Sequence, residues 1–237
     1  MGEFFDELSA SLAAWILKQK IFFVSSAPLN GEGKVNVSPK GYDALRVLGT
    51  NQVCYLELTG SGIETQSHLE ENGRITLMLC AFEGSPKIVR LWGRGRVVRV
   101  DTPEFDTLLE THYQDSDIYN ATGKRAIIVI DVDQVGVSCG WAVPYMDFKS
   151  ERPTHKKYWK SKTEVDVQDY WVLKNRFGLD GLPAMRHERM GPEWDRHKSG
   201  KFDKGLLTNG TWLANLSLVG VGLAAGAAVA SIVLRRR

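Results

Sequence analysis

The chain has 237 residues, of which 43% are hydrophobic, and a formal net charge of +2 at pH 7. This length fits one domain of about 180–200 residues with additional segments. A net charge so close to zero argues against a nucleic-acid-binding surface. The three cysteines, Cys54, Cys80 and Cys139, form no CxxC or Cys/His set. We therefore expect reduced thiols beside apolar strands and no metal site.

The first 20 residues have the pattern of an amphipathic helix. Hydrophobic residues recur there at helical spacing, at Phe5, Leu8, Leu12, Trp15 and Ile16. A stripe of this kind packs against a core, and the early acidic residues argue against a signal peptide. We expect residues 1–20 to form a helix on the surface of the main domain.

A strand is predicted at residues 21–24, and a second at residues 34–38 after a turn rich in Pro, Asn and Gly. Within the second strand Val35 and Val37 alternate with polar residues, as in one arm of a hairpin. Pro39 ends this strand and Lys40 follows it. Lys40 is either a solvated surface lysine or a charge held at the strand end for binding.

The run from Tyr55 to Leu79 reads as a strand, a Thr-Gly-Ser-Gly bend at residues 59–62, a short helix that ends at residues 72–73, and another strand. The free N–H groups and the dipole of a helix N-terminus favour an anion. Thr59, Ser61 and Thr65 add hydroxyl donors. The bend therefore predicts a phosphate site. The alternative is an ordinary strand-to-helix connection in which Ser61 is the helix N-cap.

The long strand that follows contains several arginines. Arg90, Arg94 and Arg96 fall on one face of it, with glycines between them that indicate a bulge or the close approach of a planar ligand. This basic ridge could bind a phosphate or an anionic substrate, or pair with Glu57 and Glu83 of neighbouring strands. The elements predicted in this part of the chain are strands at 74–82, 88–100 and 125–137 and a helix at 103–113.

The C-terminal third contains segments of clearly different composition. Residues 139–148 form a loop containing Trp141 and Tyr145, and residues 153–177 read as a charged helix. Residues 185–211 are polar and basic, as expected of a linker. Residues 213–234 then carry no charge over about 33 Å of helix, which is enough to span a bilayer. We expect a transmembrane tail anchor at residues 212–237.

Several motifs together resemble one known family. They are VNVSPKG at 35–41, LTGSGIETQSHLEENGRITLMLCAFEG at 58–84, IVRLWGRGRVV at 88–98, the run at 125–148 and, more weakly, KNRFGLDGLPA at 174–184. In this order and spacing they resemble the pyridoxamine 5′-phosphate oxidase-like superfamily of FMN-binding split barrels. The resemblance implies a mainly β fold, a six-stranded antiparallel split barrel over residues 21–184 with peripheral helices. It also implies a homodimer that holds two FMN molecules at its interface.

The resemblance also implies roles for particular residues. In that family a basic residue at the end of the second strand helps to bind FMN, which corresponds here to Lys40. The expected cofactor-binding residues are Ser38, Lys40, Thr59, Ser61, Thr65, Arg90 and Arg94. Trp141 and Tyr145 either line the substrate cavity near the flavin or plug the end of the barrel.

Two departures separate this chain from the authentic pyridoxamine phosphate oxidases. Those enzymes bind the flavin phosphate with an Arg-Lys pair just after the bend, where this chain has Glu64 and Thr65. They also end in a strand with an Arg-x-His-Asp-Arg motif, whereas the run at residues 186–189 lies in the polar linker. Pyridoxamine phosphate is therefore not the expected substrate.

Two functions from different classes follow. The first is an FMN-dependent oxidoreductase of unknown small organic substrate, with NAD(P)H as electron donor. The second is a non-catalytic binding protein for FMN, a B6 vitamer or haem, with His68 and His112 as candidate haem ligands. The expected location is the cytosolic face of the mitochondrial outer membrane, the peroxisome or the endoplasmic reticulum, with the anchor in the membrane.

Overall fold

A computed structural model describes residues 2–185 of the chain. Its centre is one antiparallel sheet with the strand order β3-β2-β6-β7-β8-β5-β4, to which β1 adds by pairing with β8. The described part thus has eight strands where six were expected. The strands are β1 Glu3–Phe5, β2 Phe22–Ser26, β3 Asn36–Lys40, β4 Leu45–Gly49, β5 Gln52–Leu58, β6 Arg74–Cys80, β7 Ile88–Arg99 and β8 Lys124–Ser138.

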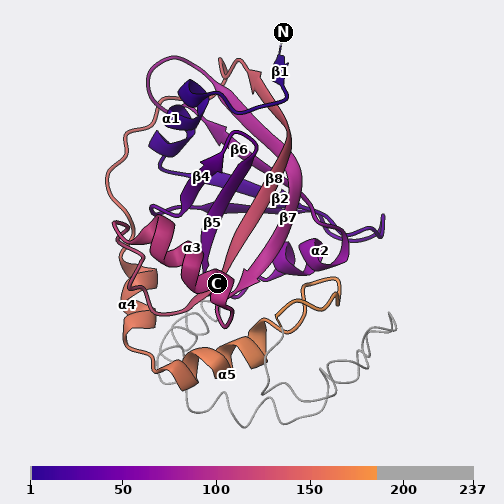
Figure 1. Cartoon of the computed structure of the whole chain (residues 1–237), viewed down its shortest axis with the longest axis vertical. Coiled ribbons are helices and arrows are strands. Elements are labelled where there is room, and N and C mark those ends of the chain that lie inside the picture. The colour runs from indigo at the N-terminus through magenta and orange to yellow at the C-terminus, as the bar shows by residue number, and fades with distance from the viewer. Residues whose placement is uncertain (1, 186–237) are drawn as a thin grey trace, which may run out of the picture. The chain divides into compact units, whose positions relative to one another are not determined.

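Five helices flank this sheet in the described residues. They are α1 Ala10–Lys18, α2 Glu64–Asn72, α3 Pro103–Tyr113, α4 Thr154–Lys160 and α5 Glu164–Lys174. Figure 1 shows the long strands β7 and β8 side by side through the middle of the molecule, with α1 near one end of them and α3, α4 and α5 near the other. The sheet is therefore the scaffold, and the helices are peripheral.

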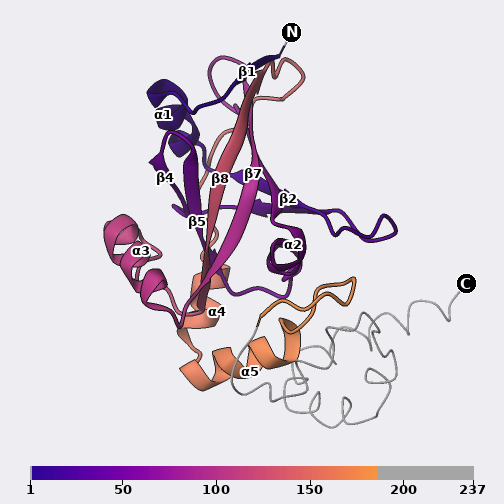
Figure 2. The same cartoon turned by 45° about the vertical axis from the view of Figure 1, so that its right-hand side comes forward.

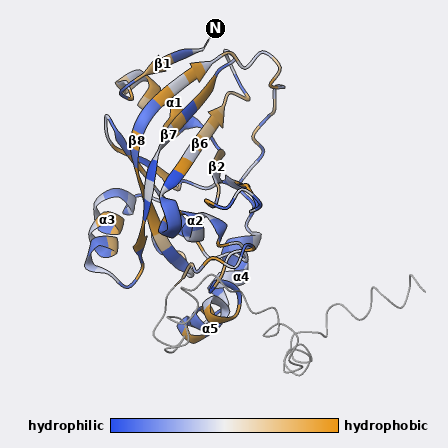
Figure 3. Cartoon of the chain, turned by 90° about the vertical axis from the view of Figure 1, so that its right-hand side faces the viewer, coloured by the Kyte–Doolittle hydropathy of each residue, from blue (hydrophilic) through white to orange (hydrophobic). Residues whose placement is uncertain are grey.

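The core lies along β5 and β8. These strands pair over seven positions, and residues 126–130 of β8 and 53–56 of β5 are all buried. A strand with both faces covered reads as a continuous apolar run rather than an alternating one. Figure 3 shows hydrophobic segments within the strands of the sheet and a mainly hydrophilic α2.

Local sequence signals set several helix ends. The Thr102 hydroxyl accepts a hydrogen bond from the Phe105 N–H, and Pro103 takes the first position of α3, as N-terminal caps do. Gly73 ends α2 with φ of 72°, the left-handed region that glycine adopts at little cost. Both helices agree with the sequence prediction.

The N-terminal segment and the charged segment after the loop differ from expectation. Ser9 caps α1 with its hydroxyl, so the helix begins nine residues later than predicted. Phe4 and Phe5 lie instead in β1 and are exposed. The segment predicted as one charged helix is split into α4 and α5, because Thr163 and Asp166 form a capping box that starts α5 afresh.

A close approach explains one glycine of β7. A Cβ at Gly93 would lie 2.0 Å from the Asp131 carbonyl oxygen of β8. The pairing register of β7 and β8 shifts at this point, between Trp92 and Gly93. The glycine therefore lies at an irregularity of the strand pairing, as the bulge alternative predicted, while the close approach of a planar ligand stays a prediction.

The predicted membrane anchor requires a correction. Among residues 2–185 no helix has the length and apolar character needed to cross a bilayer. The span at 213–234, most of the polar linker and the run at 186–189 lie outside the described residues. The described residues accordingly form an antiparallel β structure with flanking helices, and this finding does not fit the tail-anchored location that was expected.

Candidate functional site

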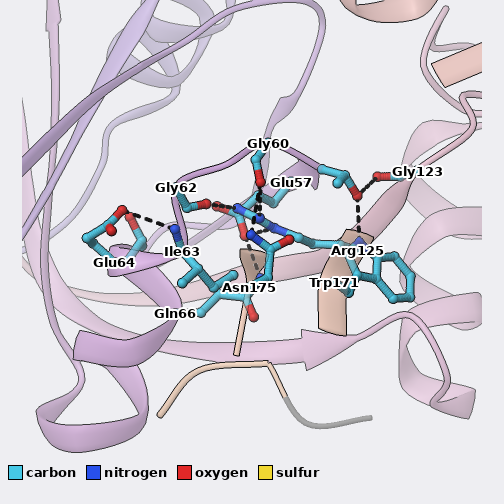
Figure 4. Close-up of polar contacts among 12 residues, drawn as sticks. Glu57, Gly60, Gly62, Ile63, Glu64, Gln66, Gly123, Arg125, Trp171 and Asn175 are labelled. Atoms are coloured by element: carbon cyan, nitrogen blue, oxygen red, sulfur yellow. Dashed lines mark hydrogen bonds and ion pairs between the residues drawn. The ribbon is translucent and has the colours of Figure 1, made fainter. Parts of the chain in front are cut away.

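The bend between β5 and α2, predicted to hold a phosphate, is closed by contacts within the chain (Figure 4). Thr59 is completely buried. Its hydroxyl donates to the Gly123 carbonyl at 2.6 Å and accepts from Trp171 Nε1 at 2.8 Å. Its carbonyl accepts from His155 Nε2 at 2.7 Å. The Thr59 hydroxyl therefore has no donor left for a phosphate.

The bend also presents carbonyl oxygens to its surroundings. Arg125 donates to the Gly60 oxygen at 3.1 Å and to the Gly62 oxygen at 2.8 Å. Asn175 Nδ2 donates to the Gly60 oxygen at 3.0 Å. Carbonyl oxygens repel an anion, so this side of the bend is built to hold a guanidinium and an amide.

At the start of α2 a backbone N–H group also has a hydrogen-bond partner within the chain. The helix N-cap is Ile63, which has no side-chain cap, and its N–H donates to the Glu64 carboxylate at 3.0 Å. Ser61 is exposed and is not the N-cap that the alternative interpretation expected. A carboxylate from the chain itself thus stands where a bound anion was predicted. Phosphate binding by Thr59 and Ser61 stays a prediction that this geometry does not favour.

A buried carboxylate joins the bend to β3. Glu57 is only 2% exposed and contacts Arg125 Nε at 3.2 Å, Lys40 Nζ at 3.2 Å and Gln66 Nε2 at 2.6 Å. Burial by itself raises the pKa of Glu57, but the charges of Arg125 and Lys40 and the hydrogen bonds from Arg125 and Gln66 outweigh burial and lower this pKa to about 2. Glu57 is therefore ionised, and it pairs with these two cations rather than with an arginine of β7.

The three charged groups of Glu57, Lys40 and Arg125 together carry more positive than negative charge. Lys40 and Arg125 carry one positive charge each and Glu57 one negative charge, which leaves a net charge of +1. Arg125 is buried, whereas the Lys40 side chain keeps 23% of its surface exposed. The surplus charge therefore faces solvent at Lys40, which favours an anion at that point.

Polar side chains of β3 and α2 lie beside Lys40. Asn36 Nδ2 donates to the Thr65 hydroxyl at 3.1 Å, and the Ser38 hydroxyl donates to Asn36 Oδ1 at 2.9 Å. We refer to Asn36, Ser38, Lys40 and Thr65 as the β3–α2 cluster. Next to it the Tyr55 hydroxyl is buried without a well-formed hydrogen bond among the described residues. The cluster offers hydroxyl, amide and ammonium groups, a donor set that fits a phosphate or another polar part of a cofactor.

His68 borders the cluster but is not open to a ligand. It is 1% exposed, its Nδ1 lies 2.9 Å from the Ser26 hydroxyl, and its Nε2 lies 3.9 Å from Asp180. Burial lowers its pKa, which opposes protonation. Both ring nitrogens face partners inside the fold, so His68 does not have the accessible nitrogen that a haem ligand needs.

The predicted basic ridge lies on β7, away from this cluster. Arg90 donates to the Ser138 hydroxyl at 3.4 Å, and the exposed Arg94 donates to the Asn72 carbonyl at 3.1 Å. The structure does not bring either arginine to the β3–α2 cluster of the same chain. Cofactor binding by Arg90 and Arg94 stays a prediction that involves a second copy of the chain.

The two aromatic residues of the loop after β8 point to solvent. Trp141 is 83% exposed and Tyr145 is 80% exposed. The interpretation that they plug the end of the sheet is therefore wrong. A role in lining a substrate cavity stays a prediction.

Sequence reasoning missed the residues whose side chains close the bend, which are Arg125, His155, Trp171 and Asn175, and it missed the partners that Glu57 takes. The sequence did contain one indication of the pair formed by Glu57 and Arg125. Glu57 and Arg125 are charges within or beside strands that are otherwise apolar, and a buried charge needs a partner of opposite sign. The two residues are 68 positions apart along the chain, so nothing local identified them as that pair.

Three comparisons with known proteins show what this chain is similar to. A model of the family described as pyridoxamine 5′-phosphate oxidase matches residues 8–139. The chain is 35% identical over 200 residues to the pyridoxamine 5′-phosphate oxidase family protein ustO of Aspergillus flavus, a match that covers 78% of each protein.

Solved structures resemble the chain more distantly. HupZ of Group A Streptococcus is 16% identical, with a TM-score of 0.43 over 54% of this chain and 91% of that one. HutZ, the heme storage protein from Vibrio cholerae, is 15% identical, with a TM-score of 0.39 over 56% and 94%. Similarity at this level supports no argument about function. The family match and the identity to the Aspergillus protein together show that the chain belongs to the pyridoxamine 5′-phosphate oxidase family.

Proposed function

We propose that the chain binds FMN and works as an FMN-dependent oxidoreductase on a small organic substrate other than pyridoxamine phosphate. The observation that carries the proposal is the β3–α2 cluster, which places a surplus positive charge at Lys40 among hydroxyl and amide groups. Membership of this family makes a flavin the expected occupant of such a cluster.

The chain's own residues would hold the cofactor by charge and hydrogen bonding. Lys40 attracts the phosphate, and its partner Glu57 keeps the ammonium in place. Asn36, Ser38 and Thr65 are already oriented by their mutual hydrogen bonds, so little side-chain entropy is lost on binding. When bound, FMN would supply the redox chemistry between NAD(P)H as electron donor and the substrate.

The proposal includes a homodimer. Strand β3 is an end strand of the sheet, and its Val37 and the preceding Val35 are 61% and 69% exposed. Unpaired edges with apolar side chains are surfaces that proteins cover. A second copy at this edge would cover the β3–α2 cluster and bring residues such as Arg90 and Arg94 of the partner towards it.

Binding is tested by purifying the full chain, recording its absorbance between about 300 and 550 nm, and titrating FMN by flavin fluorescence. We expect the Lys40→Met variant to bind FMN about tenfold more weakly, since it loses one charge-assisted contact. Lys34→Met is the matched control, because Lys34 is an exposed lysine of the same hairpin. Equal affinity of all three proteins would contradict the placement of the phosphate.

Turnover is tested with the flavin-loaded protein under anaerobic conditions. Bleaching of the flavin absorbance on addition of NADPH supports an oxidoreductase. Absorbance that persists supports the alternative of a non-catalytic FMN-binding protein. A protein that contains no flavin and takes up none would contradict both.

A further inference from the structure

A second candidate site is separate from the β3–α2 cluster. A cavity of about 400 Å³ is formed where the end of β7, the loop that enters β8 and helix α5 meet. Figure 2 shows α5 next to the ends of these strands. The volume falls within the range of about 300–1,000 Å³ that small-molecule sites occupy. None of the residues that line the cavity belongs to the β3–α2 cluster, so it is a separate site.

One wall of the cavity is apolar and has a fixed shape. It is made by Trp171 and Val167 of α5 together with Val100 at the end of β7. The indole N–H of Trp171 donates to the buried Thr59 hydroxyl at 2.8 Å, so the orientation of the ring is set by the bend. A rigid indole face of this kind suits a flat apolar partner.

The cavity is also lined by two cations with unused donors. The Lys124 ammonium donates to the Tyr119 and Ala121 carbonyls at 2.8 and 3.1 Å, and within residues 2–185 it forms no ion pair. An ammonium has three donors, so one remains. Arg99 pairs with Glu70 through Nη2, while its Nη1 is buried with no hydrogen-bond partner in the described chain.

The acidic residues of the cavity lie at its edge. Asp101 and Glu164 also line it, but both are exposed, whereas Lys124 and Arg99 are half-buried. Burial lowers the pKa of Lys124 because the charged form loses water. A negative group brought next to Lys124 would replace that water and supply the missing counter-charge. The inner part of the cavity thus favours an anion.

We propose that this cavity binds a small molecule with a flat aromatic body and one carboxylate. The carboxylate contacts the third donor of Lys124, with Arg99 adding positive charge nearby. The aromatic body lies against Trp171 and Val167. The site takes its ligand independently of FMN, because none of its residues belongs to the β3–α2 cluster.

Isothermal titration calorimetry of the full chain with 2-naphthoate tests the proposal. We expect one molecule to bind per chain, and the uncharged 2-naphthamide, which has the same shape, to bind about tenfold more weakly. Lys124→Met should reduce naphthoate affinity by about tenfold as well, and abolish the difference between acid and amide. Lys160→Met, an exposed lysine of α4, is the matched control and should bind as the unmodified chain does.

A second variant separates loss of binding from loss of folding. Gln168→Trp places a large side chain in the cavity from the half-buried face of α5, and should prevent naphthoate binding while FMN affinity and the melting temperature stay unchanged. The proposal is overturned if naphthoate does not bind, if both variants bind it as well as the unmodified chain, or if FMN displaces it. Because FMN affinity is measured separately, failure here is distinct from failure of the proposed function.

Discussion

At the scale of single residues, Glu57 contacts more elements around the candidate site than any of the residues expected to bind a cofactor. Its carboxylate contacts a lysine of β3, a glutamine of α2 and Arg125 near the start of β8. Removing one partner of a buried ion pair costs more than the pair contributes, because a charge is left buried without compensation. Glu57 therefore stabilises the fold and also positions Lys40.

Glu57→Gln should lower the free energy of unfolding by about 3 kcal/mol, since Arg125 would keep its charge in a buried place without a counter-ion. Urea unfolding followed by circular dichroism measures this. Glu104→Gln is the control, because Glu104 pairs with Arg96 on the surface. An exposed pair contributes about 0.5 kcal/mol. Equal losses in the two variants would show that the Glu57 network is not a buried one.

The same carboxylate predicts a pH dependence. The pKa of Glu57 is lowered from 4.5 to about 2 in the folded chain. A depressed pKa means that the ionised group stabilises the fold above about pH 4.5, and that this contribution is lost as the pH falls towards 2. The difference in unfolding free energy between the unmodified chain and Glu57→Gln should be constant between about pH 5 and 7 and shrink below about pH 4.5. A difference that grows on acidification would contradict this sign.

At the scale of elements, the bend after β5 is held by helices far along the chain. His155 of α4, Trp171 of α5 and Asn175 just beyond α5 all contact residues 59–61. The carbonyls of residues 59–61 take donors from other elements, because the bend has no regular partner strand there. The packing of α4 and α5 thus determines the shape of the connection between β5 and α2.

Thr59→Val tests whether the bend is structural or binds phosphate. The variant loses the hydroxyl between Gly123 and Trp171, which should lower the free energy of unfolding by about 1–3 kcal/mol because the buried indole N–H loses its acceptor. Hydrogen exchange should become faster in α5. We expect FMN affinity to stay within about twofold of the unmodified chain. A loss of tenfold or more, without faster exchange, would restore Thr59 as a phosphate ligand.

At the scale of the whole molecule, the exposed edge of β3 predicts the oligomeric state. Val37→Glu places a charge on the surface proposed to face a second copy, and should convert a dimer to a monomer in light scattering coupled to size exclusion. FMN binding should weaken in parallel, because the partner's contribution is lost. Leu173→Glu is the control, since Leu173 is similarly exposed on α5. A chain that is monomeric before substitution would contradict the proposed dimer.

Some of the fold could be predicted from the sequence because the relevant signals are local. Thr102 and Pro103 start α3 at the predicted position, and Gly73 ends α2. Strand β7 was expected at residues 88–100 and spans Ile88–Arg99. Caps, glycines and apolar runs act on neighbouring residues, so a single sequence carries them. Within the candidate site, Lys40, Ser38 and Thr65 were expected, and the structure places all three together.

The sequence by itself determined the family, the antiparallel β class and the ends of several elements. Only the tertiary structure decided which hydrogen-bonding groups of the bend are already used within the chain. That depends on contacts such as Arg125 with Glu57 and Trp171 with Thr59, which join residues 68 and 112 positions apart. No local pattern encodes such pairs, because each forms only when the sheet and the later helices have packed. Hydrogen-bonding groups that look free along the sequence can therefore be fully used in the folded chain.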